Sequence, residues 1–489
     1  MTRGPIAGSR TMAGAPREFA PAAHSVRHAA LVVRRVVQIA TAILFASGHF
    51  LWLRWRLRHE NGARERALGQ AIVGLCTRLG ATFIKVGQIV SSRSDLLPPL
   101  FARELAALQD RVPPFPFSQA RAIVESELGR PLSELFCSFS VEPVAAASVA
   151  QVHRAVWRAT GEEVAVKIRR PDVLDKIRLD RAVLLFCATW LERLVPSLRL
   201  VSLRAQIVQF CEAVERQAHL RNEARNNQRF QDHFAGDPDI RFPRLVAGAC
   251  TDAVLVMEFV HGLHESELDS APVDRGRIVR AGVRCVGKMV FEHGFVHADL
   301  HPGNIRFQAP GSIVLLDLGL VGELTAADRK ITAETLLALV QGDGRRVARL
   351  FFEHAPFKAV ADYTSYEREM EELVAELRQR DMASTEFSRD IARIFDVLRR
   401  HRVQARGHMT MVNLALMTAE GLGKRLDPSL VLAEAARPYL LNGIRSAERI
   451  LAEAHDSPAA PLCGLQGGAQ LGCELGQASG VPGLPRVEP

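Results

Sequence analysis

Cysteine is scarce in this chain, and so is lysine. The eight cysteines among 489 residues are scattered from Cys76 to Cys473, and no two stand in a CxxC spacing. This argues against a disulfide framework and against a cysteine zinc site, so a reducing compartment is the simplest expectation. Only seven lysines are present, so arginine is the default basic residue here.

Internal repeats and strong composition bias are absent too. Hydrophobic residues make up 48% and charged residues 24% of the chain, which excludes a disordered protein, a collagen-like repeat and a coiled-coil rod. No solenoid period is visible. The chain is too long for one small core, and the usual domain size predicts about two to four packed units.

The positive charge lies almost wholly at the N-terminus. The net charge is +8, and residues 1–60 hold nine arginines against the two acidic residues Glu18 and Glu60. A nucleic-acid-binding protein would carry its basic patch on the folded body, so we expect no nucleic-acid partner. An anionic membrane surface suits a basic arm better.

The most apolar stretch, residues 36–52, lies inside this arm and is flanked by arginines. Its length is at the short limit for a bilayer span, so we expect an interfacial or docked helix, with a transmembrane helix as the alternative. No cleavable secretory signal is expected, because the basic segment before it is about 35 residues long. We expect a cytoplasmic, peripherally membrane-associated protein, or a mitochondrial one if the source is eukaryotic, since a transit peptide is also arginine-rich.

The order of predicted elements is typical of a two-lobed kinase. Helical spacing dominates residues 60–130 until a proline cluster at 113–116 breaks the chain. A β-hairpin is predicted over 149–168, with its turn at Thr160–Gly161. Beyond it, the pattern predicts helices over 173–234, a strand at 253–260, a helix at 275–293, short strands at 305–307 and 313–316, and helices over 325–453.

We therefore expect an α+β protein with a bilobal protein-kinase-like fold, a helical N-terminal extension and a mainly helical C-lobe. The predicted segments are a basic and apolar arm at 1–60, a helical extension at 61–130, the N-lobe at 131–262, the C-lobe at 263–455 and a disordered tail at 456–489.

The sharpest motif is "HADLHPGN" at 297–304, followed by "VLLDLG" at 314–319. Phosphoryl transfer needs an Asp that meets the attacking hydroxyl or water, and an Asn five residues later that reaches a metal; Asp299 and Asn304 have this spacing. Asp317 follows an apolar strand and precedes Leu-Gly, where a kinase places its second metal ligand. The alternative is that both aspartates are ordinary turn residues near glycine, with no role in chemistry. Two motifs at this spacing, each at the end of a strand or helix, argue against that alternative.

Lys167, in the strand "VAVKI", is the candidate lysine for the nucleotide phosphates. Such a lysine needs a glutamate partner on a following helix, and Glu223 in "NEARNN" is the candidate, with Glu212 and Glu215 as competitors on sequence alone. A single lysine at a strand end is usually just solvated, so this prediction depends on its context.

No G-x-G-x-x-G loop precedes that lysine. An alanine run stands there instead, and it would hold nucleotide differently, because alanine restricts the backbone where glycine does not. An alanine run is normally helix, but its place beside a β-hairpin favours a loop. The candidate cofactor-binding residues are Ala145, Ala146, Ala147, Ser148 and Val149, together with Lys167 and Glu258.

The alanine loop, "HADLHPGN", "DLG" and the N-terminal "KVGQIVSSRSDLLPP" at 85–99 together resemble the UbiB (AarF-like) family of atypical kinases. The resemblance extends from about residue 65 to residue 440. The Lys-x-Gly-Gln element, here Lys85, Gly87 and Gln88, is specific to that family. It implies ATP or ADP and Mg²⁺ as cofactors, and catalytic roles for Asp299, Lys167 and Glu223. It also implies that Asn304 and Asp317 bind the metal.

The resemblance further implies a regulatory extension that covers the active site through Lys85 and Gln88. In the family this extension contacts a Glu-x-Asp before the ion-pair glutamate, but here Gln217 and His219 stand at those positions. We therefore expect Lys85 to lack its carboxylate partner, with Gln217 still able to form a hydrogen bond. An ordinary helix-face role is expected for His219, a pH-dependent contact being the alternative.

The family supports ubiquinone and related isoprenoid-lipid pathways, so the resemblance implies an isoprenoid quinone precursor or membrane lipid, and quinone-biosynthesis proteins, as partners. Two C-terminal transmembrane helices found in many members are not expected here, because charged residues interrupt 409–452. Two alternatives stay open: a small-molecule phosphotransferase, whose relatives lack the Lys-x-Gly-Gln element, and a nucleotide-gated lipid-binding protein without useful turnover.

Overall fold

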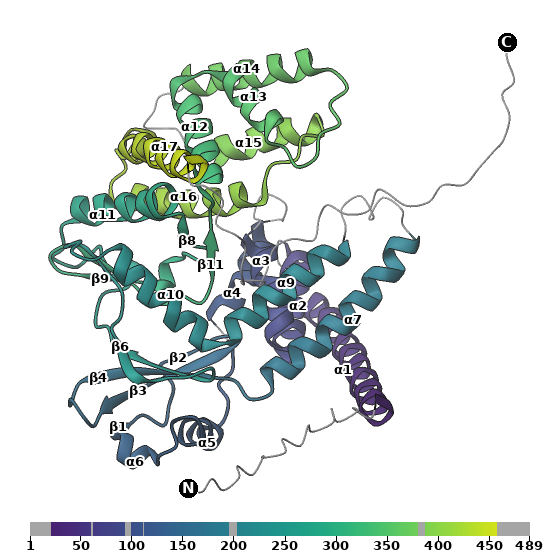
Figure 1. Cartoon of the computed structure of the whole chain (residues 1–489). Coiled ribbons are helices and arrows are strands. Elements are labelled where there is room, and N and C mark those ends of the chain that lie inside the picture. The colour runs from purple at the N-terminus through teal and green to yellow at the C-terminus, as the bar shows by residue number, and fades with distance from the viewer. Residues whose placement is uncertain are drawn as a thin grey trace, which may run out of the picture.

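The computed structural model describes residues 21–59, 62–92, 99–110, 112–194, 203–379 and 387–456. Figure 1 shows a β-sheet lobe at the bottom, a helical lobe at the top and a group of helices beside them. The predicted tail at 456–489 lies outside the described residues apart from its first residue, and so do residues 1–20 of the predicted arm.

The N-lobe contains an antiparallel sheet with the strand order β1-β3-β4-β7-β6. The short strand β2 pairs with the beginning of β3, at Gln151 and Val152. The hairpin predicted at 149–168 is confirmed as β3 and β4. The strands are β1 (Phe136–Phe139), β2 (Ala145–Ala146), β3 (Ala150–Trp157), β4 (Glu163–Arg169), β6 (Leu245–Cys250) and β7 (Val254–Glu258).

Helices cover both faces of this sheet, which explains why β4 is buried along almost its whole length. Alternate residues of a strand point to opposite faces. Val164 and its neighbours at 166 and 168 pack with α5 (Phe117–Leu128) and α6 (Leu132–Leu135). Ala165 packs on the other face with α10 (Leu220–His233), so Lys167 also faces that helix.

The helical stretch predicted over 173–234 is interrupted at His219. α9 (Leu203–Ala218) ends and α10 begins on either side of His219, which has an extended backbone. The backbone N–H of Leu220 donates to the carbonyl of Asp252 in the β6–β7 turn. This bond fixes the start of α10 against the sheet.

The C-lobe is mainly helical, as predicted, and its core is formed around α11, α12, α16 and α17. It also contains two small sheets: β10 pairs with β5 and β9, and β11 pairs with β8. Its helices are α11 (Arg275–Gly287), a π-helical turn (Lys288–His293), α12 (Ala326–Gln341), α13 (Gly344–Glu353), α14 (Tyr363–Gln379), α15 (Phe387–Arg400), α16 (Gly407–Leu426) and α17 (Leu432–Asp456). Its strands are β5 (Ile240–Arg241), β8 (Phe295–His297), β9 (Ile305–Gln308), β10 (Ser312–Leu315) and β11 (Val321–Glu323).

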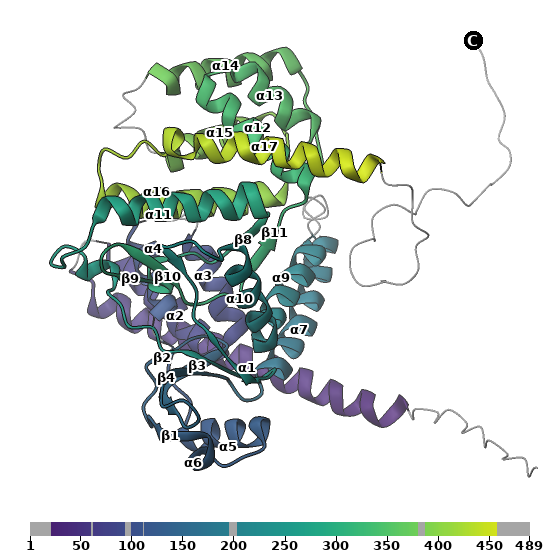
Figure 2. The ribbon, with the colours of Figure 1, turned by 60° about the vertical axis from the view of Figure 1, so that its left-hand side comes forward.

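The N-terminal extension consists of α1 (Pro21–Arg56), α2 (Ala63–Leu79), α3 (Ala81–Ser92) and α4 (Pro99–Asp110). It packs with α7 (Val173–Leu194) and α9 beside the two lobes, as Figures 1 and 2 show from two directions. The described part of the arm is helical from Pro21 to Arg56. Within the described residues, one helix is long and apolar enough to cross a membrane, the segment Ala30–Arg56 of α1.

A buried ion pair holds α1 against the folded body. The Arg35 guanidinium donates from Nε to Oδ1 of Asp180 on α7 at 2.7 Å, and it also donates to the carbonyl of Leu79 at 2.6 Å. Arg35 and Asp180 are only 5% and 1% exposed. The first helix is therefore attached to α7 and to the end of α2 at Arg35.

Candidate active site

Strand β4 and helix α10 bring together a buried ion pair. The Lys167 Nζ lies 2.8 Å from both carboxylate oxygens of Glu223. Burial would lower the pKa of Lys167, but the charges of Asp317 and Glu223 outweigh it and raise this pKa, so the lysine is protonated. Of the three candidate glutamates, Glu223 pairs with the lysine, whereas Glu212 and Glu215 contact Arg181 and Arg178 on α7.

Asp317 lies on the other side of the same lysine, 3.3 Å from its Nζ. The residue follows β10, and its Oδ1 accepts a hydrogen bond from the backbone N–H of Gly319 at 3.1 Å. Burial would raise the pKa of this carboxyl, but Lys167 and the Gly319 amide hold it below its usual range. Asp317 therefore stays ionised, and 42% of its side chain remains open to solvent.

The loop that follows strand β8 carries Asp299 and Asn304. The Asn304 Nδ2 donates to the carbonyl of Asp299 at 3.1 Å, which fixes the two residues relative to each other. The Asp299 N–H donates to Nδ1 of His297 at 3.1 Å. Because His297 is 1% exposed and burial lowers its pKa, a neutral ring holds the loop in place.

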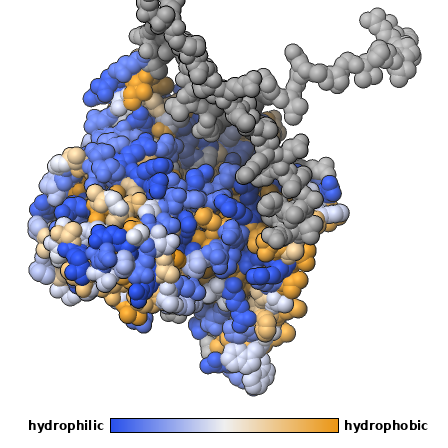
Figure 3. Space-filling model, turned by 60° about the horizontal axis from the view of Figure 1, so that its bottom comes forward, coloured by the Kyte–Doolittle hydropathy of each residue, from blue (hydrophilic) through white to orange (hydrophobic). Residues whose placement is uncertain are grey.

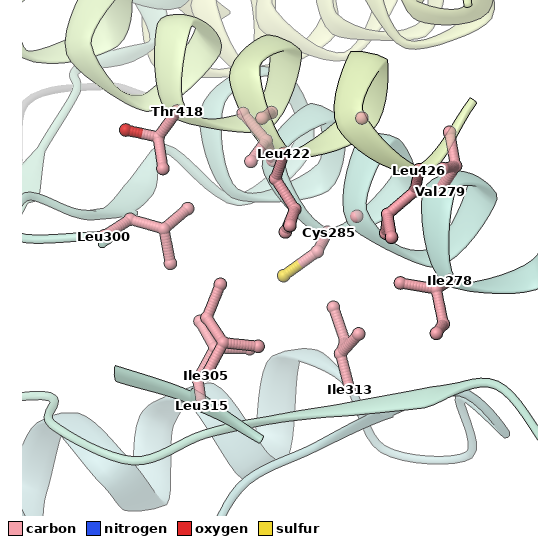
Figure 4. Close-up of a pocket in the computed structure, with 14 residues that line it drawn as sticks. Ile278, Val279, Cys285, Leu300, Ile305, Ile313, Leu315, Thr418, Leu422 and Leu426 are labelled. Atoms are coloured by element: carbon pink, nitrogen blue, oxygen red, sulfur yellow. The ribbon is translucent and has the colours of Figure 1, made fainter. Parts of the chain in front are cut away.

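An apolar anchor lies directly under that loop. Leu300 is 9% exposed and points with Ile305 of β9 toward Cys285 of α11 and Leu422 of α16 (Figure 4). These side chains surround a cavity of about 30 Å³. The packing of Leu300 therefore fixes the backbone next to Asp299.

The alanine run forms a strand and a turn instead of a helix, as its place beside the hairpin predicted. Ala145 and Ala146 pair with β3, and the Ala147 N–H donates to the Ala150 carbonyl at 2.8 Å across the turn. Ser148 and Val149 form that turn, and both are half-buried. Glu258 ends β7, where its carboxylate binds Arg241 at 3.1 Å and Arg244 at 3.2 Å.

The N-terminal extension reaches the loop that carries Asp299, but its contact differs from our expectation. Lys85 does have a carboxylate partner: its Nζ lies 2.9 Å from Oδ2 of Asp299. Gln88 donates to the carbonyl of Leu108 at 3.0 Å and so joins α3 to α4. A side chain in place of Gly87 would collide with Leu108, which explains the glycine of the Lys-x-Gly-Gln element.

The two altered positions do not serve as the partner of Lys85 in this structure. His219 precedes α10, and its Nδ1 lies 3.9 Å from the carboxylate of Asp252. Gln217 lies in the last turn of α9 and is half-buried. We expected a hydrogen bond from Gln217 in place of the missing carboxylate contact, and the geometry instead gives Lys85 a charged partner in the C-lobe.

Two supporting residues were missed in the sequence. Asn226, one turn after Glu223, donates to the carbonyl of Leu318 at 2.8 Å and ties α10 to the segment after Asp317. His297 begins the motif that contains Asp299, and its position alone did not reveal a buried supporting role. The asparagines in "NEARNN" were a visible signal, since polar side chains facing the core need partners.

Residues 107–351 match the ABC1 atypical kinase-like domain, and residues 370–431 match the UbiB helical domain. Over 388 residues the chain is 32% identical to "Probable protein kinase UbiB" of Pectobacterium carotovorum subsp. carotovorum (strain PC1), an alignment that covers 78% of this chain and 71% of that protein. The chain belongs to the UbiB family of atypical kinases. The predicted family and the predicted kinase-like fold are therefore confirmed.

Among solved structures, the complex of Rv3197 with erythromycin from Mycobacterium tuberculosis is 22% identical to this UbiB-family chain. The match covers 72% of this chain and 93% of the other, with a TM-score of 0.43.

The residues present suit a magnesium ion held jointly with nucleotide. The described residues contain no cluster of three or more His, Cys, Asp or Glu side chains that would hold a metal alone. Mg²⁺ in kinases is usually bound by one or two protein oxygens together with phosphate oxygens. Asp317 is a half-buried carboxylate that solvent can reach, and Asn304 uses its amide nitrogen on Asp299, which leaves its amide oxygen for a metal.

Proposed function

We propose that this UbiB-family protein binds Mg-ATP or Mg-ADP and acts as an atypical kinase or ATPase in ubiquinone or related isoprenoid-lipid biosynthesis at a membrane. The observation that carries the proposal is the position of Lys167, with Glu223 at 2.8 Å on one side and Asp317 at 3.3 Å on the other. Burying Glu223 and half-burying Asp317 around one ammonium costs desolvation free energy. Such an arrangement is typical of a site that binds a metal ion and a polyphosphate, and it is unusual in a purely structural core.

The roles follow from the geometry. Lys167 would bind the α- and β-phosphates, and the hairpin of β2 and β3 would cover them. Asn304 and Asp317 would hold Mg²⁺, whose charge neutralises the phosphates and orients the γ-phosphoryl group when it is bound. Asp299 would orient the attacking hydroxyl or water and accept its proton.

The contact between Lys85 and Asp299 favours a second candidate function. An ammonium 2.9 Å from Oδ2 of Asp299 occupies one oxygen of the carboxylate that would accept the proton of a substrate hydroxyl. A protein with this contact intact would bind nucleotide and turn it over slowly. Nucleotide-gated binding of a lipid, with an isoprenoid quinone precursor or quinone-biosynthesis proteins as partners, is consistent with that behaviour.

The membrane part of the proposal rests on α1. Leu44, Phe45 and Trp52 are 71%, 64% and 48% exposed although they belong to the most apolar stretch of the chain. A water-exposed apolar helix with arginines at both ends is suited to the membrane interface. The described C-lobe offers no second helix of this kind, so peripheral association would depend on α1.

Thermal stabilisation by Mg-ATP tests the nucleotide site. Asp317→Asn should abolish the magnesium-dependent part of the stabilisation, because the metal loses its one carboxylate ligand. Asp269→Asn is the matched control, since Asp269 is 82% exposed and lies on a C-lobe turn away from the site. Undiminished stabilisation of the Asp317→Asn variant by Mg-ATP would overturn the assignment.

A further inference from the structure

A large cleft lies between the N-terminal helices and the N-lobe, and most of the charged residues in its lining are basic. Its volume is about 810 Å³, and Arg78, Arg170 and Lys176 all line it. Arg35 lines it too, although that guanidinium is bound to Asp180. Asp172 is the acidic residue of the lining within the described residues. The cleft therefore carries a net positive charge.

None of the three remaining cations has a carboxylate within ion-pair distance in the part of the chain that the structure describes. Arg78 stacks over the ring of Phe45 at 4.9 Å. Lys176 is exposed, in the first turn of α7. Three cations that share one cleft without partners repel one another, and an anion between them would remove that repulsion.

Arg170 is the central group of this set. Its Nε donates to the carbonyl of Ala147 at 2.8 Å, and a terminal nitrogen donates to the carbonyl of Pro113 at 2.7 Å. Burial lowers the pKa of this guanidinium, and no acidic group opposes the effect. Two of its five donors are thus used on neutral carbonyls, which leaves a half-buried charge that a phosphate could satisfy.

A second hollow, of about 700 Å³, adjoins the basic cleft between α1 and α2. Thr41, Phe45 and Arg78 line both hollows, so the two lie next to each other. The second hollow is otherwise mostly apolar, with Leu44 and Trp52 on its α1 side. Hydrophobic side chains also gather on the right-hand part of the face seen from the bottom of the molecule (Figure 3).

An anion site beside an apolar groove fits an amphiphile with a negatively charged head. We propose that the basic cleft binds the phosphate of an anionic phospholipid whose acyl chain lies in the groove between α1 and α2. The inference rests on the membrane association proposed above and assigns it a specific lipid site. Because Arg170 also holds the carbonyl of Ala147, the headgroup would lie one side chain away from the nucleotide hairpin.

The test titrates the full chain with a short-chain phosphatidylglycerol below its micelle concentration and follows binding by calorimetry. We expect one lipid per chain, and the triple variant Arg78→Gln/Arg170→Gln/Lys176→Gln should bind it at least about tenfold more weakly, since each contact near an anionic headgroup adds to affinity. The control variant Arg345→Gln/Lys358→Gln/Arg368→Gln removes the same charge from exposed C-lobe positions and should bind as wild type. Wild-type affinity in the first variant would overturn the proposal.

Two further sets of variants test the apolar groove and replace the triple variant if it does not fold. Gly74 lines the groove, and a side chain built there meets no atom within 4 Å. Gly74→Phe should therefore weaken the lipid and leave inorganic phosphate binding unchanged, whereas Gly421→Phe, also unhindered on α16, should change neither. Equal binding of inorganic phosphate and the lipid by wild type would contradict an acyl-chain site. If the triple variant does not fold, the double variant Arg78→Gln/Lys176→Gln, which keeps the Arg170 contacts, must still bind the lipid more weakly.

Vesicle sedimentation distinguishes an error in the assigned lipid site from an error in the proposed membrane association. We would use phosphatidylcholine vesicles containing about one fifth phosphatidylglycerol. If the wild-type chain does not sediment with them, the membrane association itself is wrong. If wild type and the triple variant both sediment and both bind the short-chain lipid equally, only the assigned site is wrong.

Discussion

At the scale of single residues, the state of Asp299 decides what this site can do. Its carboxylate faces Lys85 at 2.9 Å, and its backbone carbonyl holds Asn304. The Lys85 side chain is 10% exposed. It belongs to the N-terminal extension, which is distant in sequence from the loop that it contacts. The carboxylate that should accept a proton is therefore paired before any substrate arrives.

Removing that ammonium should raise basal activity. We expect Lys85→Met to increase ATP hydrolysis by about two- to tenfold at saturating Mg-ATP, because a contact of about 0.5–1.4 kcal/mol no longer opposes proton transfer to Asp299. Phosphate release is the measurement. Lys358→Met, at an exposed C-lobe position, is the control, and an unchanged or lower rate in the Lys85 variant would show that Lys85 does not restrain the site.

Leu300 should matter through packing alone. Leu300→Ala would enlarge the cavity of about 30 Å³ beneath the catalytic loop, and core truncations of this kind cost about 2–4 kcal/mol. The urea midpoint should fall accordingly, whereas Leu451→Ala, at a position 40% exposed, should stay within about 0.5 kcal/mol of wild type. Equal midpoints would mean that the loop does not depend on this anchor.

At the scale of elements, the sequence predicted the strands and helices that follow a regular pattern. The β3–β4 hairpin and the strand before Asp317 were visible because alternation and a turn signal coincide there. The break at His219 was not, because helical spacing continues across it without proline or glycine. The cause is the distant Asp252, whose carbonyl accepts the Leu220 N–H, and such tertiary contacts override local propensity.

A stacked histidine pair joins α10 to the π-helical turn that leads into the catalytic strand. The rings of His233 and His293 lie 4.4 Å apart at 10°. Burial, followed by the charges of His233, Lys288 and Arg329, lowers the pKa of His293 to about 4. The element that carries Glu223 is thus fixed to the C-lobe through neutral rings.

This pair predicts a loss of stability in mild acid. The unfolded chain protonates this histidine near its ordinary value, 6.5, while the folded protein does so only near 4. The unfolded state therefore binds more protons between these values, and folding stability falls as the pH drops through that window. Thermal melts from pH 7.5 to 4.5 should show a shallower slope for His293→Phe than for wild type, with His261→Phe, 65% exposed, as control. An unaltered slope would contradict the prediction.

At the scale of the whole molecule, the N-terminal extension connects an exposed apolar helix to the catalytic loop. α1 packs on α2 and α7, α2 packs on α3, and α3 carries Lys85. The sequence showed the arm, its charge and the Lys-x-Gly-Gln element separately. It could not show that α1 is docked through Arg35 and Asp180 or that Lys85 reaches Asp299, because both pairs join residues more than a hundred positions apart.

The exposed face of α1 should account for membrane binding. Truncating α1 would leave Asp180 buried without Arg35, which can cost about 3–5 kcal/mol, so substitutions on the exposed face are the sharper test. Leu44→Ser/Phe45→Ser/Trp52→Ser should lower the affinity for anionic vesicles by at least about tenfold through lost apolar burial. The control Phe357→Ser/Ile450→Ser/Leu451→Ser alters exposed apolar residues of the C-lobe. Equal vesicle sedimentation of both variants would exclude α1 as the contact.

The most direct test of the account is magnesium-dependent ATP hydrolysis by the purified full chain, measured with and without anionic vesicles and a quinone-like phenol. The account predicts a low basal rate that requires Mg²⁺ and is abolished in both Asp299→Asn and Asp317→Asn, because the first residue accepts the proton and the second holds the metal. Hydrolysis that persists in both variants, or that proceeds equally well in a metal chelator, would contradict the claim that this is a phosphoryl-transfer site.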